Sequence, residues 1–236
     1  MTVSEIQDVI RDLVGRENIA DNMMTYALQG GLREIEKRSN FWWMRGNLEF
    51  DATDNNQFYL LRTAASGGLN LPNYKDLMML LSKDPSNTLW HRVEVTEFDI
   101  AEQVYATDST GEPQMAVIDN DRITLFPPDP DQTWDMKLYY WQYTTLPTDD
   151  TSDDHDTLRF WPEALIYAAT VQLNLYITKD QAIAAPYQAL FEAEYKKLDR
   201  YNKDRQVDEN TDMVPHLGPT WPRKFRRLRS PYAWTS

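Results

Sequence analysis

The sequence predicts an α+β protein: a four-helix bundle built from both ends of the chain, an inserted antiparallel β domain, and an extended C-terminal arm. Two observations lead to this prediction. Apolar residues recur at helical spacing near both ends of the chain but alternate in its middle, and this periodicity is lost after residue 204. The expected segments are the first half of a helical domain, the β insertion, the second half and the arm, at 1–45, 46–147, 148–204 and 205–236.

The first two helices are marked by their ends. Thr2-Val3-Ser4-Glu5 has the spacing of a capping box, and Gly15 is suited to end the helix that follows. A second helix is expected over about 18–39. The pair Gly30-Gly31 in its middle predicts either a kink or the close approach of another backbone. The aromatic run Phe41-Trp42-Trp43 is expected to pack as a core plug beneath the next domain.

The β region is expected to hold about six strands, enough for a small sandwich or barrel. Residues 48–51 and 58–61 flank a polar turn and predict a hairpin, and a further strand is expected to extend to Phe98. The proline-rich segment 127–131 predicts a tight connection between the last two strands. An acidic linker then leads to two helices, the first opened by Pro162.

Composition excludes several classes of protein. The chain has no cysteine, which removes disulfide scaffolds, thiolate zinc sites and cysteine nucleophiles. His91, His155 and His216 lie far apart in the sequence. Carboxylates are plentiful, but their spacing selects no acid–base pair. We therefore expect no metal, no cofactor and no enzyme. With no secretory signal and no long apolar run, a soluble protein made in a cytosol is expected.

Charge divides the chain unequally. Residues 1–212 carry a formal charge of −18 and residues 213–236 carry +5, which together give the net charge of −13. The tail alternates basic and large apolar side chains. This pattern suits a nucleic-acid arm, an anchoring peptide for a partner protein, or a disordered basic end. Protein docking is favoured because the acidic body would repel DNA. The candidate contact residues are Trp221, Arg223, Lys224, Phe225, Arg226, Arg227, Arg229, Tyr232 and Trp234.

An ordered set of motifs resembles the head-to-tail adaptor, or connector, proteins of tailed bacteriophages, in particular those of short-tailed phages. The resemblance covers about residues 1–204. It rests, in order, on the aromatic run at 41–43, on Leu71-Pro72-Asn73-Tyr74 and on the segments 123–130, 136–140 and 160–165.

The resemblance implies a structural virion protein at the head–tail interface, assembled in the host cytoplasm. Such adaptors form a ring, usually a dodecamer, of identical copies under the portal protein. The implied partners are the portal, the tail nozzle or tail tube protein, and tail fibres, while DNA passes through the lumen without specific binding. No membrane and no catalysis are implied. The alternative function from the residues is a carbohydrate- or receptor-binding tail accessory protein that uses the aromatic β region.

Overall fold

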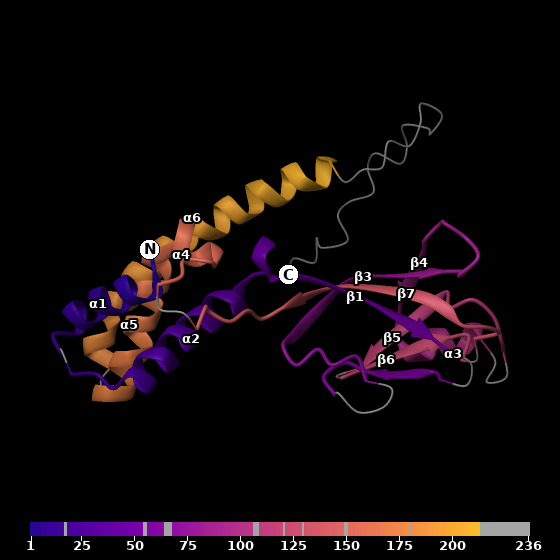
Figure 1. Cartoon of the computed structure of the whole chain (residues 1–236), viewed down its shortest axis with the longest axis horizontal. Helices are drawn as coiled ribbons and strands as arrows, with labels where there is room; N and C mark the ends of the chain where they lie inside the picture. The colour runs from indigo at the N-terminus through magenta and orange to yellow at the C-terminus, as the bar shows by residue number, and fades with distance from the viewer. Residues whose placement is uncertain are drawn as a thin grey trace.

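The fold divides into a helical part and a sheet (Figure 1). The computed structural model describes residues 1–16, 18–53, 56–63, 68–105, 109–119, 121–128, 130–148, 151–179 and 181–212. The chain leaves the helices after residue 44, builds the sheet, and returns after residue 142. The helices of the described residues are α1 (Val3–Val14), α2 (Asp21–Arg38), α3 (Phe98–Val104), α4 (Asp156–Phe160), α5 (Pro162–Thr178) and α6 (Gln181–Asp212), with a short 3-10 turn at Trp42–Met44.

The ends of α1 confirm two sequence predictions. The Thr2 hydroxyl accepts a hydrogen bond from the Glu5 backbone N–H at 3.2 Å, and the Glu5 carboxylate accepts one from the Thr2 N–H at 2.9 Å. This reciprocal pair satisfies two of the N–H groups that a helix start leaves without a partner. At the other end, Gly15 adopts the left-handed conformation at φ 66°, which glycine reaches without steric cost.

The predicted four-helix bundle from both ends of the chain is wrong. Six helices are spread along the described chain, and α3 lies within the sheet region. In the helical part, α1, α2, α4 and α6 each pack on α5. The physical reason is that α5 is apolar around most of its circumference, whereas a bundle helix has one apolar stripe. Its buried residues are Ala164, Leu165, Ile166, Ala168, Ala169, Thr170, Val171, Leu173 and Asn174.

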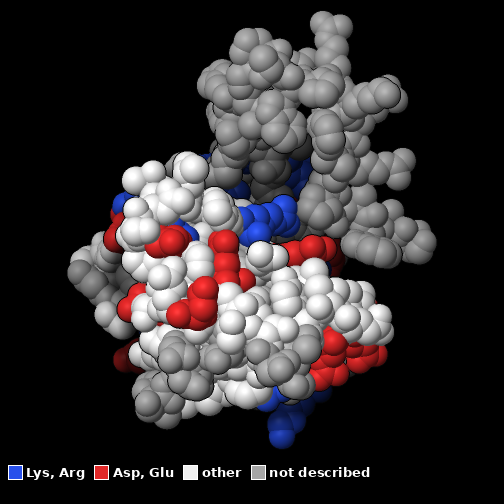
Figure 2. All heavy atoms as spheres, turned by 90° about the vertical axis from the view of Figure 1, so that its right-hand side faces the viewer, with Lys and Arg blue, Asp and Glu red and all other residues white. Residues whose placement is uncertain are grey.

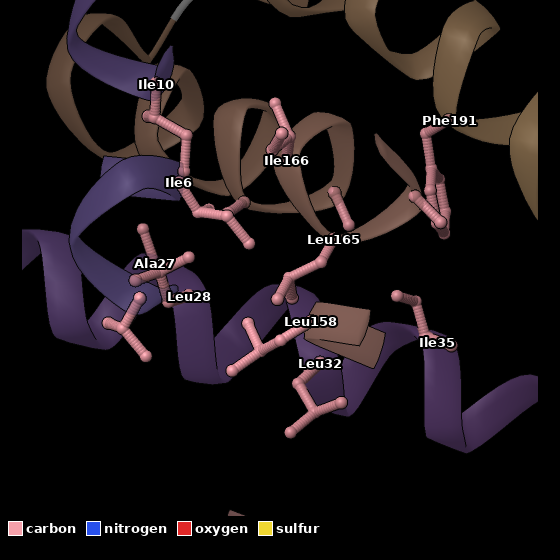
Figure 3. Close-up of a cluster of buried hydrophobic side chains, with 14 of the residues drawn as sticks. Ile6, Ile10, Ala27, Leu28, Leu32, Ile35, Leu158, Leu165, Ile166 and Phe191 are labelled. Carbon is pink, nitrogen blue, oxygen red and sulfur yellow. The ribbon is translucent and has the colours of Figure 1, made fainter. Parts of the chain in front are cut away.

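A single apolar core joins these helices. Figure 3 shows side chains from α1, α2, α4, α5 and α6 that point toward one another, among them Ile6, Leu32, Leu158, Leu165 and Phe191. Each of these five is at most 1% exposed. The core therefore joins segments from the two ends of the sequence.

The β region is one curled sheet of seven strands in the order β1-β7-β3-β4-β5-β6-β2. The predicted antiparallel sandwich or barrel is therefore wrong: the strands form a single sheet that begins with β1 and ends with β2, and β4 and β5 run parallel. Parallel neighbours need a crossover connection, and α3 lies between these two strands in the chain. The strands are β1 (Arg45–Ala52), β2 (Phe58–Leu60), β3 (Tyr74–Lys83), β4 (His91–Val95), β5 (Met115–Asp119), β6 (Arg122–Phe126) and β7 (Trp134–Gln142).

The predicted hairpin between β1 and β2 does not form. β1 pairs with β7 and β2 pairs with β6, which places the two strands at opposite edges of the sheet. The sheet curls so that these edges still meet through side chains. The rings of Phe50 and Tyr59 have centroids 5.1 Å apart, and the Tyr59 hydroxyl accepts a hydrogen bond from the Thr53 N–H at 3.0 Å. The curl thereby encloses a second apolar core.

Candidate interaction surfaces

The junction between helices and sheet is organised around one buried carboxylate. Glu36 lies near the end of α2 and is 0% exposed. It accepts hydrogen bonds from the Trp43 indole at 3.2 Å and from the Thr144 backbone N–H at 3.0 Å, and the Thr144 hydroxyl also donates to it. Trp43 lies where the chain enters the sheet and Thr144 where it returns. We call these two connecting segments the crossings. The Glu36 carboxylate holds both of them against α2.

His155 extends this network. Its Nε2 lies 2.9 Å from the Thr144 hydroxyl, and its Nδ1 accepts from the Thr157 N–H at 3.2 Å. Burial lowers the pKa of His155 to about 4, against the opposing effect of Asp156 and Asp154. The imidazole is therefore neutral at pH 7, with its proton on Nε2, because Nδ1 accepts. Burial also raises the pKa of Glu36, while hydrogen bonds from Thr144 and Trp43 oppose that rise.

These hydrogen bonds join segments that lie far apart in the sequence. The Thr144 hydroxyl donates to Glu36 and lies beside the protonated nitrogen of His155. The network thereby orients the two crossings relative to α2.

Lys75, at the start of β3, adds a third segment to the junction. Its ammonium donates to the backbone carbonyls of Glu36 at 2.5 Å and Ser39 at 3.0 Å. These carbonyls belong to the end of α2, where the helix leaves acceptors without intrahelical donors. Burial lowers the pKa of Lys75, with Glu36 and Asp76 opposing that shift. The junction thus fixes how the sheet leaves the helices.

Beside the junction lies an aromatic surface, which we call the aromatic shelf: the neighbouring rings of Trp42, Trp161 and Tyr201, together with Phe160, which directly precedes Trp161 in the chain. The Tyr201 ring lies 5.5 Å from Trp42 and 5.7 Å from Trp161, and the guanidinium of Arg205 lies 4.6 Å over Trp42. Phe160 is 59% exposed and Tyr201 47%. Exposed aromatic groups with a nearby arginine are typical of protein–protein contacts.

A second exposed aromatic pair joins α2 and α5. The rings of Tyr26 and Tyr176 meet edge to face with centroids 5.4 Å apart, and both side chains are more than half exposed. Met23, Leu175 and Ile183 of the adjacent helix ends are exposed as well. The helical part therefore presents two separate apolar surfaces.

The structure places the predicted aromatic run in two environments. Phe41 is 0% exposed and stacks on Trp43 at 4.4 Å, as a core plug would, whereas Trp42 belongs to the aromatic shelf. Sequence reasoning missed the shelf because Tyr201 falls on the apolar spacing of its helix. The adjacent Phe160-Trp161 before Pro162 was an available signal.

The predicted contact residues of the arm lie outside the described residues: Trp221, Arg223, Lys224, Phe225, Arg226, Arg227, Arg229, Tyr232 and Trp234. Helix α6 continues to Asp212, so the first residues of the predicted arm at 205–236 are helical. Within the described residues, no three His, Cys, Asp or Glu side chains lie close enough to hold a metal ion. None of the described helices is long and apolar enough to span a membrane.

Comparison with known proteins identifies the family. A search of curated proteins found no match. The family model described as SU10 adaptor protein matches residues 1–215, which include every helix and strand described above. The match confirms the resemblance to adaptor proteins of short-tailed phages. The chain belongs to the SU10 adaptor protein family.

Proposed function

We propose that this adaptor is a structural component of the virion that joins the portal of the phage head to the tail as a ring, with no catalysis and no cofactor. The observation that carries the proposal is the family match over residues 1–215. In this proposal, the helical segments 1–45 and 148–204 face the portal and neighbouring copies. The inserted segment 46–147 faces the tail nozzle or tail tube and the fibres.

The hydrogen-bonded junction between helices and sheet supports a role in holding two partners in a fixed relative position. A component that joins two structures must hold its two parts at a defined angle. Glu36, Thr144, His155 and Lys75 connect α2 to both crossings and to β3 through short hydrogen bonds. Because Glu36 is buried, its hydrogen bonds are shielded from water and resist opening.

Ring formation requires two unlike surfaces on each copy. In a closed ring, one face of a protomer meets a different face of its neighbour. The aromatic shelf and the Tyr26–Tyr176 pair are two such exposed surfaces on the helical part. We propose a dodecameric ring in which these surfaces contribute to subunit contacts.

Charge supports the passage of DNA through the ring without specific binding. Each copy carries a net charge of −13, and like charge keeps DNA from adhering to a channel. The same charge opposes the association of free copies, so the portal is expected to template the ring. The basic arm supplies attachment to the portal or to a neighbouring copy, with its arginines pairing with acids and its aromatic groups filling pockets.

The arm is tested by its removal. A chain that ends at residue 212 should fold, with an unchanged circular-dichroism spectrum, but should fail to form a ring-sized complex with the portal of the same phage. A full-length variant with all five basic residues of the arm changed to glutamine should fail in the same way. Unchanged portal binding by both variants would refute the proposed role of the arm.

The aromatic shelf has its own test. Phe160→Ser removes a side chain that is 59% exposed, so it should weaken ring formation on the portal with little effect on protomer stability. Leu89→Ser is the matched control, because Leu89 is 65% exposed on the loop before β4. Equal effects of both variants would count against the shelf as a subunit contact.

A further inference from the structure

A third candidate docking surface lies at the far end of the sheet, on and beside α3. Four apolar side chains are exposed there: Val95 by 45%, Phe98 by 40%, Ile100 by 47% and Val104 by 55%. Four carboxylates alternate with them, and all are exposed: Glu94, Glu97, Asp99 and Glu102. We call these eight residues the α3 surface. The segment 94–104 contains no lysine or arginine.

The exposure follows from how α3 packs. The helix has seven residues and is held on the sheet by Ala101, which is 0% exposed, and by the Phe98 ring, 5.9 Å from that of Phe126. Its remaining sides face outward. Figure 2 views this end of the molecule and shows acidic side chains interspersed among uncharged ones, with some basic side chains near the middle and the lower edge of the view. Within the described residues, none of the four carboxylates lies in an ion pair.

We propose that the α3 surface binds the basic arm, residues 213–236, of a second copy of this chain. The two segments are complementary in two respects. The arm carries five basic and no acidic residues, whereas the α3 surface carries four acidic and no basic ones. Both interleave charge with large apolar groups: Phe225, Leu228 and Trp234 of the arm match a surface that offers Phe98 and Ile100. Such a contact gains from ion pairing and from apolar burial.

The geometry permits the contact between copies. Helix α6 runs from the helical part toward the side of the sheet, so the arm begins at that side (Figure 1). At about 3.3 Å per residue, an extended arm spans up to about 80 Å. The choice of a second copy rests on the proposed function, since a ring of copies that each carry −13 needs a contact that offsets their repulsion. The arm and the α3 surface are different surfaces, as ring closure requires.

Photo-cross-linking in the full-length protein tests this inference. The benzophenone amino acid p-benzoylphenylalanine replaces Phe225, and mass spectrometry identifies the peptide to which it attaches. Mixing ¹⁵N-labelled with unlabelled copies separates cross-links between chains from those within one chain. The experiment is done with the protein alone and with the portal. The expected product is an interchain cross-link to the peptide that contains residues 94–104.

Charge variants make the test specific. Changing Glu97→Gln, Asp99→Asn and Glu102→Gln together should lower the cross-link yield roughly tenfold, and added salt should lower it as well. The matched control changes three exposed carboxylates of the helical part, Asp12→Asn, Asp21→Asn and Asp204→Asn, and should leave the yield nearly unchanged.

Several results would overturn the inference: cross-links only within one chain, cross-links only to other segments or to the portal, or no cross-link in either sample. The mass of the portal mixture separates this inference from the proposed function. A portal complex that forms without a cross-link to residues 94–104 refutes only the α3 contact. The absence of any portal complex refutes the proposed function.

Discussion

Gly31 of α2 lies directly against the backbone of Ala169 in α5: a β-carbon placed on Gly31 would be 2.7 Å from the Ala169 backbone nitrogen. Real β-carbons do not approach backbone atoms this closely. The predicted close approach of another backbone at the glycine pair is therefore confirmed for Gly31. Its neighbour Gly30 differs, because a β-carbon there would meet only the Gln172 side chain, at 3.6 Å.

The two glycines predict opposite effects of the same substitution. Gly31→Ala should destabilise the protein by about 1–3 kcal/mol, since α2 and α5 must separate to admit the methyl group. Gly30→Ala should be neutral or stabilising by up to about 1 kcal/mol, because alanine favours the helix. Urea denaturation of both variants measures the difference. Equal stabilities would show that the two helices do not cross as closely as described.

Glu36→Gln tests the central carboxylate of the junction. An amide keeps the shape but places an N–H₂ group where the carboxylate accepts from Thr144 and Trp43. An unmatched buried donor costs about 1–3 kcal/mol, so the free energy of unfolding should fall by that amount. Glu34→Gln, on the same helix with a side chain 33% exposed, is the control and should cost less than about 1 kcal/mol. A loss no larger at Glu36 than at Glu34 would contradict the structural role.

His155 should make stability depend on pH. Its pKa is about 4 in the folded protein and 6.5 when unfolded, so the unfolded state binds a proton more readily between these values. Stability is therefore fully present above pH 6.5 and falls as pH drops toward 4, by up to about 3 kcal/mol. Glu36, whose folded pKa is raised, acts in the opposite sense. Comparison with His155→Gln across this range isolates the histidine, and parallel stability curves would refute the prediction.

Lys75→Met tests the contribution of the Lys75 ammonium to the junction. The variant keeps the aliphatic stem but removes the ammonium that donates to the carbonyls of Glu36 and Ser39. Thermal unfolding should show a loss of about 1–3 kcal/mol, because two carbonyls near the end of α2 lose their donor. Lys37→Met, exposed on the last turn of α2, should change stability by about 0.5 kcal/mol or less.

Local chemistry made parts of the fold predictable from the sequence. The capping box of Thr2 and Glu5, the left-handed Gly15 and Pro162 at the start of α5 each depend on residues within one helical turn. The proline-rich segment after Phe126 likewise connects β6 to β7, as predicted. Such signals carry their own physical cause and need no information about distant parts of the chain.

Strand pairing could not be predicted in the same way, because partners are chosen by contacts between residues far apart in sequence. β1 and β2 are close in sequence yet pair with β7 and β6. Phe98 continues an apolar strand pattern, but it begins α3 because the chain must cross over between parallel strands. The predicted helix arrangement was wrong for a related reason. How many sides of α5 are buried depends on the other helices that pack against it, and these come from distant parts of the chain.

The candidate surfaces also differ in how far the sequence predicts them. The basic aromatic arm is visible in the sequence because its residues are contiguous. The aromatic shelf brings Trp42, Trp161 and Tyr201 together from three elements, so only the fold reveals it. The α3 surface is contiguous in sequence, but two of its apolar residues, Val95 and Phe98, were assigned to a strand.

Light scattering shows whether this protein assembles on the portal. The mass of the purified full-length protein is measured alone and after mixing with the portal of the same phage. We expect a protomer alone, because a net charge of −13 opposes self-association, and a ring-sized complex with the portal. A protein that stays a monomer and leaves the mass of the portal unchanged would contradict the claim that this adaptor joins the portal to the tail.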